Sequence, residues 1–168
     1  MHSVQTTEGL AKPQAYRLIV EQVSALLEGE RDGLANAANT AALLFEALPQ
    51  LNWAGFYLLR GGELVVGPFQ GKVACVRIAM GKGVCGTAAA ERRTLVVPDV
   101  DAFPGHIFCD PASRSEIVVP LVHEGRLLGV LDIDASVRER FDEDDAAGLE
   151  AVAHLLVSGS DWGWLPSE

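Results

Sequence analysis

Three cysteines are the residues of this chain with the clearest chemical potential. Cys75, Cys85 and Cys109 form an odd-numbered set, with separations of 10 and 24 residues. This spacing matches neither a secreted disulfide framework nor a paired zinc-binding motif. Because disulfides rarely persist in a reducing cytosol, the three thiols are either inert or chemically active.

Each cysteine has both a structural and a chemical interpretation. Cys109 lies in the loop-like segment PGHIFCDPASRSE, whereas a thiol used for packing belongs among aliphatic neighbours. His106, three residues before it, is a candidate proton partner. Cys85 lies where a helix is expected to begin, which favours the thiolate and makes it the first candidate nucleophile from the residues alone, although simple packing is equally compatible. Cys75 falls in an expected strand beside β-branched residues, where burial without chemistry is favoured.

An acidic pair and an aromatic pair are the next candidates. Asp132 and Asp134 are two apart on an expected strand and therefore share one face, and Glu116 opens the preceding strand of the same hairpin. Such a cluster suits a cationic ligand or a proton donor with a raised pKa, but a solvent-facing edge is also compatible. Trp53 and Tyr57 are four apart on an expected strand and share one face. They are either core residues or an apolar wall for a small substrate.

The segment GKGVCG, residues 81–86, formally matches a dinucleotide-binding G-x-G-x-x-G turn. That motif needs a parallel βαβ unit, whereas the rest of the chain favours antiparallel hairpins. We therefore expect a tight connection from a strand to a helix. No P-loop motif occurs in the sequence.

Hydrophobic periodicity and turn residues predict the elements that position these groups. Helices are expected at residues 13–28, 32–48 and 142–156. A further alanine-rich helix is expected within residues 81–93, after the glycines at the start of that segment. Strands are expected at 51–59, 63–70, 74–80, 94–98, 116–123 and 126–134, with a long loop over 98–115 and an extended tail after 159. Hairpins of strands with helices grouped at the ends predict an α+β domain, an antiparallel sheet with helices packed on it.

Composition bounds the partners of the chain. Its 168 residues fit one domain, with 49% hydrophobic and 21% charged residues. A net charge of −10 opposes binding to nucleic acid. The N-terminus lacks a signal-peptide pattern and no long apolar run occurs, so we expect a cytoplasmic protein without a membrane partner.

Several segments together resemble the free methionine-(R)-sulfoxide reductases, which are built on a GAF-type domain. They are WAGFYLL, GPFQGKVACVRI, GKGVCGTA, GHIFCD, SEIVVPL and GVLDID, and the resemblance spans roughly residues 51–156. It implies a single GAF-like domain over residues 1–168, with a core at 13–157, short flexible ends and a central antiparallel sheet of about six strands.

The resemblance also implies an activity, the reduction of free L-methionine (R)-sulfoxide. Cys109 matches the attacking cysteine of that family and Cys75 the resolving one, while Cys85 matches a third cysteine whose role is less settled. The oxidised Cys109 would condense with Cys75, or with Cys85, to a disulfide.

The family's substrate positions are matched as well. Glu116, Asp132 and Asp134 correspond to its substrate carboxylates, with Glu116 or Asp134 as the acid, and Trp53 and Tyr57 correspond to aromatic wall positions. The resemblance implies thioredoxin as external reductant, no bound cofactor or metal, and a homodimer. The alternatives are a small-molecule-sensing GAF module and a thiol redox switch that responds to peroxide.

Overall fold

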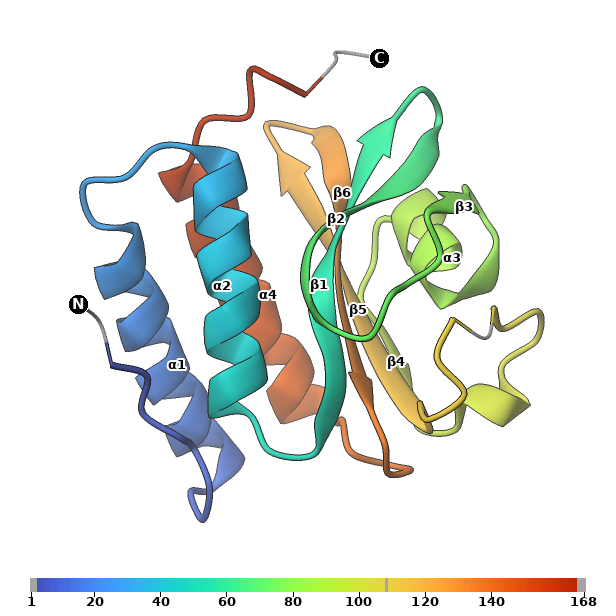
Figure 1. Ribbon diagram of the computed structural model, residues 1–168, viewed down its shortest axis with the longest axis horizontal. Coiled ribbons are helices and arrows are strands. Elements are labelled where there is room, and N and C mark those ends of the chain that lie inside the picture. Colours follow the sequence, from blue (N-terminus) through green and yellow to red (C-terminus); the bar gives the residue numbers. More distant parts are fainter. Residues whose placement is uncertain (1–2, 108, 166–168) are drawn as a thin grey trace.

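The computed structural model describes residues 3–107 and 109–165, whose strands form a single antiparallel sheet (Figure 1). The strands are β1 (Leu51–Arg60), β2 (Glu63–Gly71), β3 (Arg77–Ala79), β4 (Leu95–Val97), β5 (Ser115–His123) and β6 (Arg126–Ala135). They lie in the order β3-β2-β1-β6-β5-β4, and every neighbouring pair is antiparallel. The α+β fold class and the six-stranded antiparallel sheet are thus confirmed.

Two helices, α2 (Gly33–Ala47) and α4 (Glu143–Gly159), pack on one face of the sheet, and α1 (Lys12–Leu27) packs against these two helices (Figure 1). The starts of α2 and α4 are specified locally, because Asp32 accepts hydrogen bonds from two backbone amides in the first turn of α2 and Asp142 forms a capping box on α4. Alternate residues of β1, such as Phe56 and Leu58, pack against these helices in the larger of two apolar clusters.

The opposite face of the sheet carries the short helix α3 (Gly83–Glu91), the 3-10 turn η1 (Val100–Ala102) and long loops. A second apolar cluster lies there, and it includes Trp53 and Tyr57 of β1. The predicted shared face of these two aromatic residues is confirmed. The candidate chemistry therefore lies between the sheet and α3, away from the three long helices.

The strand expected at residues 74–80 is wrong at its beginning. Only Arg77–Ala79 forms β3, and Cys75 lies in the loop before it. The β2–β3 pairing ends at Val65↔Arg77, and Cys75 is instead tied to Cys109 by a disulfide. The expectation that Cys75 is an inert strand residue is therefore also wrong.

The C-terminal segment packs more closely than expected. Helix α4 continues to Gly159, and Trp162 and Leu165 are buried in the helix-side core, so this core reaches beyond residue 157. Trp162 Nε1 donates a hydrogen bond to the Val157 carbonyl, which turns the chain back onto α4. Within residues 3–107 and 109–165, no helix has the length and apolar character needed to cross a membrane.

Candidate functional site

A row of side chains crosses three central strands on the α3 side of the sheet. Trp53 of β1 pairs with Asp134 of β6, which pairs in turn with Glu116 of β5. Directly paired residues project from the same face. Asp132 lies two residues before Asp134 on β6, so its side chain projects from the same face. Its partner on β1 is Gly55, which has no side chain. The predicted meeting of the three carboxylates is confirmed.

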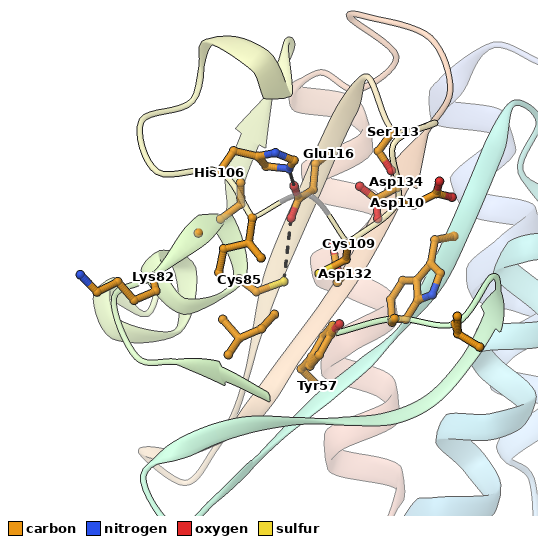
Figure 2. Close-up of a pocket in the computed structure, with 17 residues that line it drawn as sticks. Tyr57, Lys82, Cys85, His106, Cys109, Asp110, Ser113, Glu116, Asp132 and Asp134 are labelled. Carbon is orange, nitrogen blue, oxygen red and sulfur yellow. Dashed lines mark hydrogen bonds and ion pairs between the residues drawn. The ribbon is translucent and has the colours of Figure 1, made fainter. Parts of the chain in front are cut away.

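These residues line one small cavity between the sheet, α3 and the loop after η1 (Figure 2). Of the predicted site residues, all but Cys75 lie on its wall: Trp53, Tyr57, Cys85, Cys109, Glu116, Asp132 and Asp134.

A disulfide joins Cys75 to Cys109, with their Cα atoms 5.4 Å apart. It links two loops on the α3 side of the sheet that are 34 residues apart in the sequence. These are the two cysteines to which the resemblance assigns attack and resolution. Among the described residues, Cys85 is the free thiol, and it is buried.

Cys85 does not have the environment expected of a helix N-terminus. It lies in the first turn of α3, but its burial raises the pKa of the thiol well above the ordinary value, and the nearby Asp132 and Glu116 carboxylates raise it further. Its Sγ donates a weak hydrogen bond to Glu116 Oε1 at 3.9 Å. The expectation that α3 favours the Cys85 thiolate is therefore wrong, because desolvation exceeds the effect of the helix dipole.

The GKGVCG segment forms the predicted tight connection between β3 and α3. A Cβ added at Gly86 would lie 2.3 Å from the Ala79 carbonyl oxygen, so only glycine fits there. All strand pairs of the sheet are antiparallel, so the parallel unit that a dinucleotide fold requires is absent from the described sheet.

The three carboxylates all have raised pKa values, for the same physical reasons. Burial raises the pKa of Glu116, Asp132 and Asp134 well above their ordinary values, and repulsion within the cluster adds to the shift. The Oδ1 atom of Asp132 is buried and has no hydrogen-bond partner among the described residues. The cluster is therefore suited to donate a proton or to receive a cation.

His106 contributes to this cluster in a way that the sequence did not indicate. It was a candidate partner of Cys109, but its Nε2 lies 3.3 Å from Glu116 Oε2 (Figure 2). Burial lowers the pKa of His106, and Glu116 has a raised pKa. The contact is therefore between a neutral imidazole and a carboxyl group near neutral pH.

A polar network that the sequence analysis missed holds the loop around Cys109. Asp110 is nearly buried and accepts hydrogen bonds from Asn52 Nδ2 at 3.1 Å and from the Ala112 amide at 2.9 Å. The Ala112 amide is the first cause of the lowered pKa of Asp110, and Lys72 lies 3.5 Å from the same carboxylate. The local Asp-Pro-Ala sequence could have indicated this turn, because an aspartate side chain often accepts a hydrogen bond from the backbone amide two residues later.

The aromatic pair supports the loop that carries Cys75. Trp53 stacks on Tyr57 and on Phe69, with ring centroids 5.8 and 5.2 Å apart. Trp53 Nε1 donates to the Lys72 carbonyl at 3.1 Å, and the Tyr57 hydroxyl donates to the Cys75 carbonyl at 3.0 Å. Both rings are therefore core residues and a cavity wall at once.

Comparison with known proteins agrees with this geometry. The GAF domain model matches residues 13–158. The chain is 53% identical over 145 residues to the free methionine-R-sulfoxide reductase of Escherichia coli, covering 86% of this chain and 88% of that protein. It is 47% identical over 150 residues to the protein of the same name from Saccharomyces cerevisiae, covering 82% and 83%.

A solved structure shows the same relationship in three dimensions. The free methionine-R-sulfoxide reductase of Neisseria meningitidis, in complex with its substrate, superimposes with a TM-score of 0.90 at 47% identity, covering 95% of each chain. This chain therefore belongs to the GAF-domain family and, within it, to the free methionine-R-sulfoxide reductases.

Proposed function

We propose that the protein reduces free L-methionine (R)-sulfoxide to L-methionine, with Cys109 as the nucleophile. The observation that carries this proposal is the Cys75–Cys109 disulfide beside a cavity lined by buried carboxylates. A redox-active sulfur and a store of protons are the two requirements for removing oxygen from a sulfoxide.

In the first step, the thiolate of Cys109 attacks the sulfoxide sulfur. The S–O bond breaks as its oxygen passes to Cys109, which becomes a sulfenic acid, and methionine leaves with the reduced sulfur. The developing charge on the oxygen requires a proton, and Glu116 or Asp134 supplies it. Their raised pKa values support this role, because both carboxyls hold protons at a pH where exposed carboxylates do not.

In the second step, the thiol of Cys75 attacks the sulfenic acid. The S–S bond forms and water leaves, which gives the disulfide of the present structure. Cys85 is less suited to this step, because its pKa is raised and its thiol is buried against Glu116.

Recognition of the free amino acid follows from the residues that line the cavity. The ammonium group of the substrate faces the buried carboxylates, and the rings of Trp53 and Tyr57 form the apolar wall for the methyl and methylene groups. Reduction of the disulfide releases the two loops that it ties together, and we expect this to widen the entrance for the substrate.

Thioredoxin is the proposed reductant of the disulfide, through thiol–disulfide exchange. The segment around Cys75 supports this, because Val73 and Val76 are 87% and 63% exposed. An exposed apolar segment beside the disulfide is suited to contact with a dithiol protein. The homodimer and the cytoplasmic location stay predictions.

The experiment that tests the function follows NADPH consumption with thioredoxin, thioredoxin reductase and free methionine-(R)-sulfoxide. We expect oxidation of NADPH with the (R)-sulfoxide and formation of an equal amount of methionine, but none with the (S)-sulfoxide. A ligand-sensing GAF module would give no methionine. A peroxide-responsive thiol switch would consume NADPH with peroxide and show no preference between the sulfoxides.

A further inference from the structure

Two carboxylates of the cavity and the free cysteine also form a cluster of potential metal ligands. Cys85 Sγ, a carboxylate oxygen of Glu116 and one of Asp132 all lie within 4.8 Å of one another, and all three residues are buried. They come from α3, β5 and β6, and Figure 2 shows Cys85 directed at Glu116. Because the disulfide uses Cys75 and Cys109, this set is complete in the oxidised protein.

An independent observation at Asp132 points to a ligand. Its Oδ1 atom is buried without a hydrogen-bond partner in the described part of the chain, while the residue is only 6% exposed and lines the cavity. Buried carboxylate oxygens are normally satisfied by a donor or a cation. Asp134 faces the same space and adds negative charge when it is ionised.

The donor types restrict which cation fits. Magnesium and calcium prefer oxygen ligands throughout, whereas one sulfur with two carboxylate oxygens suits zinc and metals of similar softness. Around a tetrahedral zinc ion, a sulfur at about 2.3 Å and an oxygen at about 2.0 Å lie about 3.5 Å apart. The observed Cys85 Sγ to Glu116 Oε1 distance is 3.9 Å and the Asp132 oxygen lies within 4.8 Å of both, so the three side chains must move closer together to hold the ion.

We propose that Cys85, Glu116 and Asp132 form a binding site for zinc or a similar divalent cation, with a fourth position open to the cavity. The site goes beyond the reductase activity, since it uses the cysteine that the Cys75–Cys109 disulfide leaves free. Burial raises the pKa of all three ligands, so metal binding displaces protons from the cluster.

Titration of the oxidised protein with Co²⁺ tests the site directly, since Cys75 and Cys109 cannot ligate in this form. We expect a saturable near-ultraviolet absorption band from thiolate-to-cobalt charge transfer, with one Co²⁺ per chain, proton release to an indicator dye, and displacement by Zn²⁺. Cys85→Ser should abolish the band. Asp132→Asn should weaken binding at least about 10-fold, while the exposed control Glu143→Gln should leave it unchanged.

Absence of the band in the wild-type protein would overturn the proposal, as would its persistence in Cys85→Ser. Should Asp132→Asn fail to fold, the wild-type protein decides the question by its Zn²⁺-dependent rise in melting temperature, which must be lost in Cys85→Ser. The titration contains no substrate. A failure here therefore leaves the methionine assay to decide the reductase function separately.

Discussion

Raising the pH above neutrality should destabilise the oxidised protein, because its carboxylate cluster holds protons that the unfolded chain has already lost. Burial raises the pKa of Glu116, Asp132 and Asp134 in the folded protein. In the unfolded chain these groups ionise near pH 4, their ordinary range of about 3.9 to 4.3. The folded state therefore binds more protons, and the free energy of unfolding falls as pH rises until the folded pKa values are passed.

The magnitude follows from the number of protons retained. Each one lowers the free energy of unfolding by about 1.4 kcal/mol per pH unit, or about 2 kcal/mol between about pH 6.5 and about pH 8. For a chain of 168 residues, that corresponds to a fall in melting temperature of about 4–8 °C per retained proton. The lower limit of this pH range is set near the ordinary pKa of histidine, about 6.5. Below it, His106 acts in the opposite direction, since its pKa is lowered in the folded protein.

Urea unfolding followed by tryptophan fluorescence measures this slope at several pH values. Asp132→Asn should flatten this slope by about one proton's contribution, since the substitution removes one retained proton and also the repulsion that raises the pKa of Asp134. The control Glu143→Gln lies on the exposed first turn of α4 and should keep the wild-type slope. A wild-type stability that is constant over this range, or an equal slope in Asp132→Asn, would refute the argument.

Three further predictions concern the supports of the site. Asp110→Asn should lower kcat by up to about 100-fold with little change in KM, because it loosens the loop of the nucleophile; steady-state kinetics with an unchanged kcat would contradict this. Tyr57→Phe removes the hydrogen bond to the Cys75 carbonyl and should slow disulfide formation about fivefold, as measured by quenched flow. An equal slowing of the first methionine release would contradict this role. Gly86→Ala should cost about 1–3 kcal/mol in urea unfolding, since its Cβ would clash with the Ala79 carbonyl; a wild-type midpoint would disprove the tight connection.

Local rules were sufficient to place the three carboxylates together on one face of the sheet, but they left open whether this face is a solvent-exposed edge or a cavity wall. Alternation along a strand places Asp132 and Asp134 on one face, and a hairpin brings Glu116 beside them. The same rule places Trp53 and Tyr57 on a common face. These relations depend on residues that are close in sequence or joined by a short turn, so the sequence pattern contains them.

Relations between distant segments were not predictable from such patterns. The β-branched neighbours of Cys75 indicated a strand, but Cys75 lies in a loop and is bonded to Cys109, 34 residues away. The helix position of Cys85 indicated a thiolate, but burial beside two carboxylates decides its pKa. His106 reaches Glu116 only because the loop after η1 folds over the sheet. Burial and loop conformation depend on the whole fold, which periodicity does not report.

The most direct test of the account is a disulfide map after a single turnover. Fully reduced protein is mixed with one equivalent of free methionine-(R)-sulfoxide, the remaining thiols are blocked, and the peptides are identified by mass spectrometry. We expect one methionine per chain, a Cys75–Cys109 disulfide and a blocked Cys85. Cys75→Ser should still release its first methionine, whereas Cys109→Ser should release none. Three blocked thiols after methionine has formed, or a methionine burst from Cys109→Ser, would contradict the account.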